Sequence, residues 1–285
     1  MKSKTKRSKR KLGLATTIIL CCFFFLAGFY GSTLLSQDVP KIRPRLRKLE
    51  LEKSDDDVLM PHGQTGEASI QPIPFQVLSW KPRALYFPSF ATAEQCQSII
   101  EMAKVHLKPS SLALRKGETD ESTKGTRTSS GTFISSSEDK TGILDFIEKK
   151  IARATMIPQT HGEAFNVLRY EIGQKYDSHY DAFNPVEYGH QTSQRMASFL
   201  LYLSDVEEGG ETMFPFENGS NMNSGYDFRK CIGLKVKPRR GDGLLFYSLF
   251  PNGTIDRTSL HGSCPVIKGQ KWVATKWIRD QVQED

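Results

Sequence analysis

The stretch Tyr176-Asp177-Ser178-His179-Tyr180-Asp181 contains a His-x-Asp motif. In an extended strand, residues two apart point to the same side, so His179 and Asp181 can offer an imidazole nitrogen and a carboxylate oxygen to one point. His261 follows eighty residues after Asp181. If its imidazole reaches the same point from another strand, two histidines and one carboxylate occupy one face of a metal ion. This ligand set is typical of Fe(II) centres that keep open positions.

Short segments rich in β-branched and aromatic residues predict strands around this motif. They are Phe165–Tyr170, Met196–Leu203, Leu234–Val236, Gly243–Ser248 and Lys271–Ile278. Turns rich in Gly, Asp and Glu separate them, such as Glu207–Glu211 and Arg239–Gly243.

Two helices are predicted ahead of these strands. Thr92 and Gln95 form a capping box. Apolar stripes at helical spacing follow at Cys96, Ile99, Ile100, Ala103 and Leu107, and then at Leu144, Ile147, Ile151 and Ala154. Short strands at Gln76–Trp80 and Ala84–Phe87 precede them, and Lys116–Arg127 is expected to be a mobile loop. Two helices followed by many short strands predict an α+β fold with two antiparallel sheets and the helices on one side.

The N-terminal segment has the pattern of a membrane-anchored protein. Residues 1–11 carry seven Lys or Arg and no acidic residue, and residues 12–35 carry no charge. An apolar helix of about 20 residues spans a bilayer, so a cleaved signal peptide and an uncleaved anchor compete. The length of the apolar run favours the anchor, with the basic tail in the cytosol and the body in the lumen. Residues 36–75 are expected to form an extended stem, and residues 76–285 the folded domain.

The positive charge of the chain is concentrated at its N-terminus. Residues 1–48 hold twelve Lys or Arg and one acidic residue. Of the chain's 39 basic and 32 acidic residues, this leaves 27 and 31 for the remainder. A slightly acidic body gives no support to nucleic-acid binding.

The cysteines are too few for a disulfide-scaffolded fold. Two of the five lie in the apolar run, and Cys96 lies on the apolar face of a predicted helix. Cys231 and Cys264 flank the strands before and after His261. A disulfide between them is a hypothesis for an oxidising compartment.

Two glycosylation sequons fit a lumenal body. They begin at Asn218 and Asn252, and both lie in predicted turns. The expected location is the membrane of the endoplasmic reticulum, with a single type II span, and the Golgi is the alternative.

Lys271 starts a predicted strand on which Val273, Thr275 and Trp277 share its face. An inward lysine among apolar side chains is costly unless it meets an anion. A lysine at a strand end that points to solvent is the alternative. Its place ten residues after His261 favours the anion, because a dicarboxylate could chelate the metal with one end and pair with Lys271 at the other.

Further segments occur in order with these residues. They are Arg127-Thr128-Ser129-Ser130-Gly131, Tyr170, Glu207–Thr212, Gly241-Asp242 and His261–Val266. By this order and spacing, the chain resembles the 2-oxoglutarate/Fe(II) dioxygenases over roughly residues 76–285, and within them the prolyl 4-hydroxylases. A single chain with an N-terminal anchor is similar to the plant membrane-bound type. The resemblance implies a double-stranded β-helix, or jelly roll, with flanking N-terminal helices.

The resemblance also implies roles for single residues. His179, Asp181 and His261 would ligate Fe(II), and Lys271 would bind the distal carboxylate of 2-oxoglutarate. The other implied roles are contact with 2-oxoglutarate for Tyr170 and Thr212, and lining of a peptide groove for Glu163, Tyr176, Arg195 and Trp277. No catalytic side chain beyond the metal site is implied, and the Lys116–Arg127 loop would close over the peptide.

The implied reaction is hydroxylation of proline C4 in a proline-rich secretory-pathway protein, coupled to conversion of 2-oxoglutarate to succinate and CO2. It consumes O2, and L-ascorbate rescues oxidised iron. A substrate in the polyproline II form presents its rings periodically, which suits aromatic residues such as Tyr176 and Trp277. The oligomeric state is left open, with homo-oligomers and assemblies with related hydroxylases both allowed.

Three other functions compete with this one. A type II lumenal glycosyltransferase shares the architecture, but the only Asp-x-Asp pattern, at residues 55–57, lies in the expected stem. An inactive module that binds proline-rich peptides would not need the complete metal set together with Lys271. Hydroxylation of another residue type, such as lysine, stays open because the sequence discriminates substrates poorly.

Overall fold

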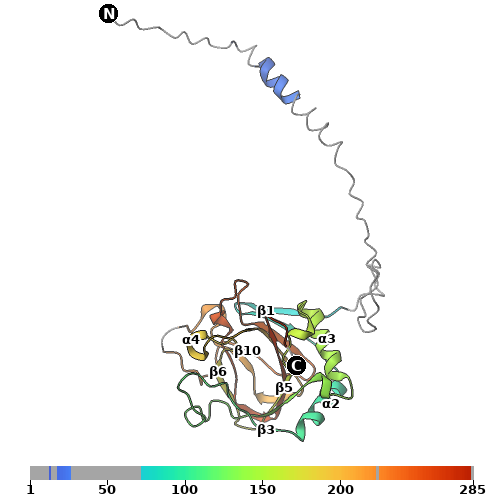
Figure 1. Cartoon of the computed structure of the whole chain (residues 1–285), viewed down its shortest axis with the longest axis vertical. Helices are drawn as coiled ribbons and strands as arrows, with labels where there is room; N and C mark the ends of the chain where they lie inside the picture. Colours follow the sequence, from blue (N-terminus) through green and yellow to red (C-terminus); the bar gives the residue numbers. More distant parts are fainter. Residues whose placement is uncertain (1–12, 14–17, 27–71, 223–224, 284–285) are drawn as a thin grey trace, which may run out of the picture. The chain divides into compact units, whose positions relative to one another are not determined.

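The structure is a computed structural model that describes residues 13, 18–26, 72–222 and 225–283 (Figure 1). The chain divides into two units, Met1–Thr65 and Gly66–Asp285. In the first unit, residues 18–26 are helical and exposed. Among the described residues, no helix is long and apolar enough to cross a membrane. The predicted anchor and stem lie largely outside the described residues.

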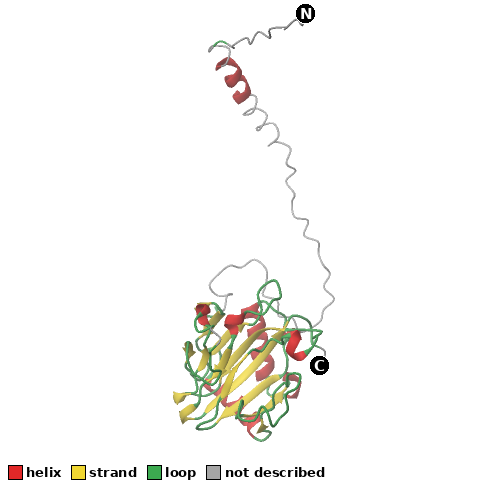
Figure 2. Cartoon of the chain, turned by 90° about the vertical axis from the view of Figure 1, so that its left-hand side faces the viewer, coloured by secondary structure: helices red, strands yellow, loops and turns green. Residues whose placement is uncertain are grey.

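Antiparallel strands form the body of the second unit (Figure 2). The large sheet has eight strands: β1 (Gln76–Trp80), β2 (Arg83–Phe87), β11 (Gly243–Tyr247), β7 (Arg195–Tyr202), β14 (Lys271–Arg279), β5 (Phe165–Tyr170), β4 (Ser130–Ile134) and β3 (Lys108–Pro109), in this spatial order. The small sheet has four: β10 (Leu234–Val236), β9 (Thr212–Phe214), β12 (His261–Ser263) and β6 (Tyr176–His179). The strands β13 (Val266–Gly269) and β8 (Val206–Gly209) form a separate pair. Helices α2 (Ala93–Lys104) and α3 (Ile143–Thr155) lie together on one side of these sheets (Figure 1).

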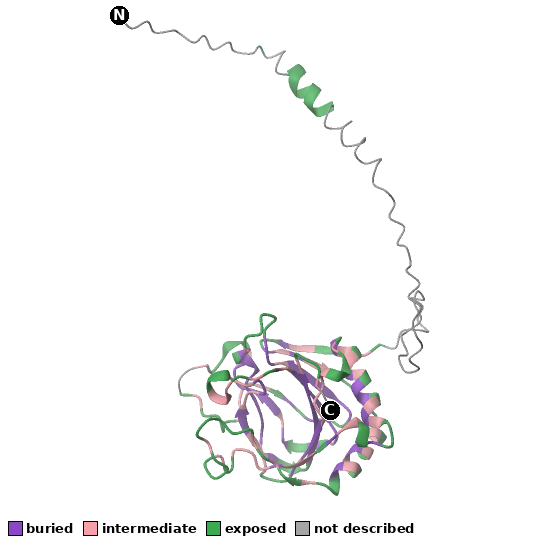
Figure 3. Cartoon of the chain, viewed as in Figure 1, coloured by how far each residue is buried: buried purple, intermediate pink, exposed green. Residues whose placement is uncertain are grey.

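Alternating side chains of the large sheet supply two hydrophobic cores, which is why both faces of its central strands are buried (Figure 3). On β14, Trp272, Ala274 and Ile278 join the core shared with α2 and α3. Val273 joins the second core, to which Phe214 of the small sheet also belongs. The second core therefore lies between the two sheets, and residues in register with Val273 face the interior.

The α2 helix begins where its sequence predicts. The side chain of Thr92 accepts a hydrogen bond from the backbone N–H of Gln95, and the side-chain oxygen of Gln95 accepts one from the backbone N–H of Thr92. Cys96 and Ile99 are fully buried on the inward face. The predicted stripe runs one turn too far, because the helix ends at Lys104 and Leu107 packs against the core from the following segment.

The prediction of a turn at Glu207–Glu211 was wrong in part. Val206–Gly209 is strand β8, which pairs with β13 and leaves the Glu207 and Glu208 side chains exposed. Only Gly209 and Gly210 make the turn, with φ of +76° and +69°, values that glycine adopts without strain. A strand with outward carboxylates has too few apolar residues to show in the sequence pattern.

A disulfide joins Cys231 to Cys264, and Cys96 is a buried free thiol. Cys231 precedes β10 and Cys264 follows β12, so the disulfide links the segments next to two strands of the small sheet. The two cysteines are 33 residues apart.

Replacing Cys231 and Cys264 together by serine is expected to lower the free energy of unfolding by about 3 kcal/mol, because a loop of this length is freed in the unfolded chain. For a domain of this size, the midpoint of thermal unfolding should fall by roughly 6–12 °C. Differential scanning fluorimetry with and without reductant measures this. Reductant should bring the wild type to the midpoint of the double variant and leave the variant unchanged, and a wild type that ignores reductant would contradict the expectation.

Candidate functional site

His179, Asp181 and His261 converge on one point between the sheets. The Nε2 atom of His179 lies 3.6 Å from one carboxylate oxygen of Asp181, and the Nε2 atom of His261 lies 3.5 Å from the other. The three ligand atoms all lie within 4.8 Å of one another. The pairing of β6 with β12 sets His261 directly opposite His179, and Asp181 follows the end of β6. The site thus has the ligand types and the spacing that one metal ion requires.

Backbone carbonyls orient both imidazoles. The Nδ1 atom of His179 lies 2.9 Å from the carbonyl of Asp177, and that of His261 lies 3.0 Å from the carbonyl of Ser259. A carbonyl only accepts hydrogen bonds, so each Nδ1 carries a proton and each Nε2 is the ring atom left to bind a metal ion beside Asp181. This is how metal-binding histidines are commonly held.

The ionisation of the site also suits a cation. Burial lowers the pKa of His179 to about 3, with a further contribution from His261, so its ring is neutral at pH 7. Burial works against the charge of Asp181, but the neighbouring His261, His179 and Arg195 outweigh it and hold the pKa of the carboxyl at about 2. The hydroxyl of Ser198 donates a 2.6 Å hydrogen bond to the same carboxylate. Two imidazole nitrogens and one carboxylate are a donor set that suits a divalent cation.

Lys271 is a buried cation, with only 1% of its surface exposed. Its ammonium donates a 2.8 Å hydrogen bond to the hydroxyl of Ser263 and lies 5.3 Å and 5.9 Å from the ring centroids of Tyr170 and Tyr202. No carboxylate forms an ion pair with it in the described part of the chain. Burial lowers the pKa of Lys271 to about 7, against a smaller opposing effect of Glu211. A buried ammonium with one hydroxyl acceptor fits an anionic ligand.

The two sheets bring the predicted co-substrate residues together. Tyr170 stands opposite Lys271 in the large sheet, and Thr212 stands opposite Ser263 in the small sheet. The Lys271–Ser263 hydrogen bond then joins one sheet to the other. Thr212 accepts a 2.8 Å hydrogen bond from Tyr202, and Thr212 and Tyr170 are each only 2% exposed.

Three of the four predicted groove residues form one cluster. Arg195 donates two 2.7 Å hydrogen bonds to the two carboxylate oxygens of Glu163, and its guanidinium lies 3.6 Å from the ring centroid of Trp277. Arg279 donates a third hydrogen bond of 2.7 Å to Glu163. Burial opposes the charge of Glu163, but Arg195 and then Arg279 hold its pKa below the usual range. Such a bidentate pair fixes the guanidinium flat against the indole.

Tyr176, the fourth predicted groove residue, lies where the groove meets the metal site. The Tyr176 ring stacks on the ring of His179, with centroids 3.6 Å apart. The guanidinium of Arg127 lies 4.8 Å from the centroid of the Tyr176 ring. Burial raises the pKa of Tyr176 above its ordinary value. The phenol therefore stays protonated and adds no charge next to the histidine.

An open groove of about 1770 Å³ runs past these residues. Tyr176, His179, Asp181, Arg195 and Trp277 all line it. Residues from the predicted loop, among them Glu118, Thr123 and Arg127, form part of its rim. Two of the metal ligands, His179 and Asp181, are thus reached from a channel large enough for an extended peptide, whereas Lys271 is buried and does not line the groove.

Sequence reasoning missed four residues of the site: Ser198, Tyr202, Ser263 and Arg279. Each acts through a hydrogen bond to a residue that was predicted. Only Ser263 had an available signal, because it lies two residues after His261 and shares the side of the strand on which that ligand lies. Ser198 and Tyr202 lie on β7, and the sequence does not show how that strand pairs with the site, whereas Arg279 lies one residue beyond the predicted end of β14.

Residues 165–279 match the family described as the 2OG-Fe(II) oxygenase superfamily. The whole chain is 75% identical to probable prolyl 4-hydroxylase 9 of Arabidopsis thaliana, with full coverage of both chains. It is 56% identical to prolyl 4-hydroxylase 13 of the same plant, over 97% of this chain and 98% of the relative.

One solved structure is also similar. It is the viral collagen prolyl hydroxylase of Paramecium bursaria Chlorella virus-1 in its 2-oxoglutarate complex, with a TM-score of 0.51 and 26% identity. The similarity covers 69% of this chain and 95% of the viral one. The antiparallel fold and the oxygenase family match the expectations for the body of the chain, and they leave no place for a nucleotide-sugar fold with alternating strands and helices.

Proposed function

This chain belongs to the plant prolyl 4-hydroxylase family of the 2-oxoglutarate/Fe(II) oxygenases, and we propose that it hydroxylates C4 of prolyl residues in proline-rich proteins of the secretory pathway. The observation that carries the proposal is the combination of three features in one interior. These are a two-histidine, one-carboxylate cluster, a buried lysine behind it, and a peptide-sized groove in front of it. Hydroxylation of another residue type has no specific observation in its favour.

Fe(II) fits the cluster of His179, Asp181 and His261. Two imidazole nitrogens and one carboxylate would leave positions on an octahedral ion for further ligands. With 2-oxoglutarate and O2, iron in such a site supplies an oxidant that removes hydrogen from an unactivated C–H bond, which acid–base groups cannot do. The protein's part is to hold the three ligands in place, through the carbonyls behind the imidazoles and through Ser198 behind Asp181.

The lysine pocket fits the far carboxylate of 2-oxoglutarate. Lys271 would form the ion pair, and Ser263, which already accepts a hydrogen bond from Lys271, would help to orient it. Thr212 and Tyr170 would line the pocket from the two sheets. Binding the anion would restore the charge that burial disfavours in the free protein, so the pocket selects a dicarboxylate.

The groove residues would hold the peptide. Trp277 lines the groove and offers its flat indole ring as a surface for a prolyl ring. Arg195, fixed against Trp277 by Glu163, offers a second flat surface for a prolyl ring. A polyproline II chain is already extended, so little conformational entropy is lost on binding. The loop at Lys116–Arg127 would close over the bound chain and exclude water.

We also propose that the enzyme works in the lumen of the endoplasmic reticulum, held by its N-terminal segment, with ascorbate as the reductant that rescues oxidised iron. The Cys231–Cys264 disulfide supports an oxidising compartment. Asn218 and Asn252 are both exposed, as glycosylation requires. Sensitivity of the apparent mass to a glycosidase, lost when both asparagines are replaced by glutamine, would test this placement.

The activity itself is tested with the full-length protein, Fe(II), 2-oxoglutarate, ascorbate and a panel of proline-rich peptides. Mass spectrometry of the products should show 4-hydroxyproline in step with succinate release. Binding of metal and 2-oxoglutarate without hydroxylation of any peptide would refute the proposed function.

A further inference from the structure

A second aromatic cluster lines the groove apart from Trp277. It consists of Phe216, Tyr226 and Phe228, and we refer to it as the Phe228 cluster. The ring centroids of Phe216 and Tyr226 lie 5.0 Å apart, and those of Tyr226 and Phe228 lie 5.2 Å apart, both edge to face. All three residues line the same groove as His179 and Trp277. None of the three belongs to the predicted groove.

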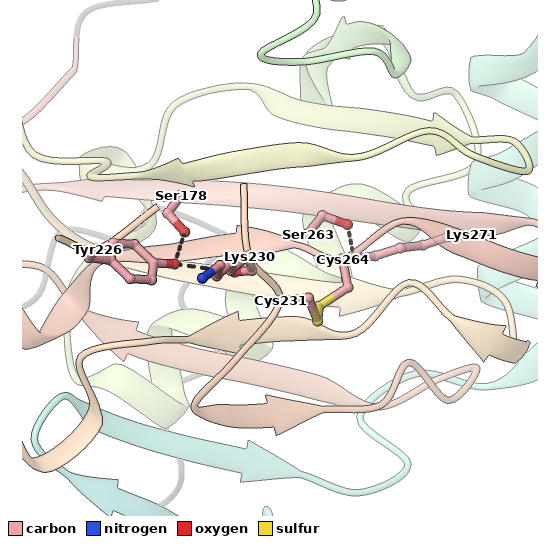
Figure 4. The surroundings of a disulfide bond; sticks show 7 residues. All are labelled: Ser178, Tyr226, Lys230, Cys231, Ser263, Cys264 and Lys271. Atoms are coloured by element: carbon pink, nitrogen blue, oxygen red, sulfur yellow. Dashed lines mark hydrogen bonds between the residues drawn. A yellow bond between two sulfur atoms is a disulfide. The ribbon is translucent and has the colours of Figure 1, made fainter. Parts of the chain in front are cut away.

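The segment that carries Tyr226 and Phe228 is fastened on both sides (Figure 4). The Tyr226 hydroxyl lies 2.9 Å from the hydroxyl of Ser178, the residue directly before the metal ligand His179. The backbone N–H of Ser178 donates a 2.9 Å hydrogen bond to the carbonyl of Phe228. Three residues further on, Cys231 is tied to Cys264. The cluster is therefore fixed relative to the metal strand before any ligand binds.

Phe228 is the exposed member of the cluster. Half of the Phe228 surface (50%) is accessible, whereas Phe216 is 6% exposed and packs against Tyr226 as the buried member of the cluster. An aromatic ring that is held rigidly and left half-exposed in a groove costs little entropy when it binds a ligand. Such rings are enriched among the residues that carry most of the energy of peptide and protein interfaces.

The Phe228 cluster and the pair Trp277 and Arg195 are attached to different sheets. Trp277 and Arg195 lie on strands of the large sheet, whereas the Phe228 cluster follows β9 and is bonded to β6 of the small sheet. The groove is continuous between them. A polyproline II chain advances about 3.1 Å per residue and presents a ring on the same side every third residue. A proline-rich chain that lies in the groove can thus contact both walls.

We propose that the Phe228 cluster is a second substrate subsite, which binds a prolyl ring of the substrate chain other than the proline that is hydroxylated. The inference rests on the proposed function and deepens it. The subsite makes the enzyme select proline-rich chains that are long enough to reach from the iron to Phe228. Short peptides with a single target proline gain nothing from it.

Replacement of Phe228 by alanine tests the subsite. The Kd of a proline-rich peptide of about ten residues should rise roughly 5- to 20-fold, as expected for loss of one aromatic contact. The Kd of a peptide of about four residues should stay within twofold of the wild type. Fluorescence polarisation of labelled peptides measures both, with Mn(II) and 2-oxoglutarate bound and oxygen excluded. Phe228→Tyr keeps the ring and should restore the affinity for the long peptide.

Phe146→Ala is the matched control, because Phe146 is 46% exposed on α3 and does not line the groove. It should leave both Kd values unchanged. Equal Kd values for Phe228→Ala and the wild type, or equal losses for long and short peptides, would overturn the subsite. Failure of the proposed function shows separately, as a wild type that binds peptides and hydroxylates none.

Discussion

Replacing His179 by alanine is expected to abolish iron binding and to reduce hydroxylation to below about one-thousandth of the wild-type rate. The variant leaves one imidazole and one carboxylate, which no longer make a three-ligand face. Even loss of a group that only orients a ligand costs about 10- to 100-fold in metal affinity, so loss of a ligand must cost more. Elemental analysis of the purified protein measures the iron, and mass spectrometry of peptide products measures the rate.

Two further variants calibrate this result. Ser198→Ala removes the 2.6 Å hydrogen bond to Asp181 and should weaken iron binding by about 10- to 100-fold, between His179→Ala and the wild type. His190→Ala removes an exposed histidine outside the groove and should change nothing. If His179→Ala keeps a full equivalent of iron, the metal lies elsewhere and the assignment of the site is wrong.

Replacing Lys271 by methionine is expected to raise the Kd of 2-oxoglutarate by about 30- to 1,000-fold, because the distal carboxylate would then be buried without its cation. The same change should make the free protein more stable by about 1–4 kcal/mol, since an ammonium without an anionic partner is removed from the interior. Titration calorimetry with Mn(II) in place of iron measures the first effect, and chemical unfolding measures the second. A variant that binds 2-oxoglutarate as tightly as the wild type would exclude the proposed role of Lys271.

The pH dependence follows from the pKa of Lys271, which burial lowers to about 7. Above that pH the free protein holds the amine neutral, and binding of the carboxylate must take up a proton. The affinity for 2-oxoglutarate should therefore fall by up to about tenfold per pH unit above pH 7. Lys271→Arg keeps its charge at all these pH values and should show no such fall.

The stability of the free protein should change with pH in the opposite sense. In the unfolded chain the lysine titrates near its ordinary value of 10.5. Between pH 7 and that value, the unfolded chain binds a proton that the folded protein has released, so the free energy of unfolding rises with pH. Below pH 7 the full cost of burying the ammonium is present. Lys271→Met should remove this slope, and an unchanged slope in the variant would assign it to other groups.

Local patterns were enough for the helices and most long strands. The α2 start at Thr92 follows from a capping box, and strands such as β14 follow from runs of β-branched and aromatic residues. Strand β8 was not predicted, because two of its four residues are exposed glutamates and the strand has no apolar run. Short strands of this kind are defined by their partners, and pairing over a long sequence distance leaves no local signal.

In the groove too, some features could be predicted from the sequence and others could not. The resemblance predicted Tyr176 as a groove residue, and the structure places it in the groove lining, but only the structure shows that its ring stacks on His179. No sequence motif predicted the Phe228 cluster. Its position depends on the Cys231–Cys264 bond and on the hydrogen bonds to Ser178, which join segments that are distant in the chain.

The sequence by itself indicated which residues to expect at the site: the His-x-Asp motif, the distant His261 and Lys271 follow from residue type, spacing and strand alternation, together with the family resemblance. The tertiary structure alone decided how these groups are held. It set the carbonyls behind the imidazoles, Ser198 behind Asp181, Ser263 against Lys271 and the aromatic walls of the groove. The physical reason is that a metal or anion ligand must be one of a few residue types, which can be recognised in the sequence. The groups that orient the ligand can be of many types and come from neighbouring strands, so the pairing of the strands determines which residues they are.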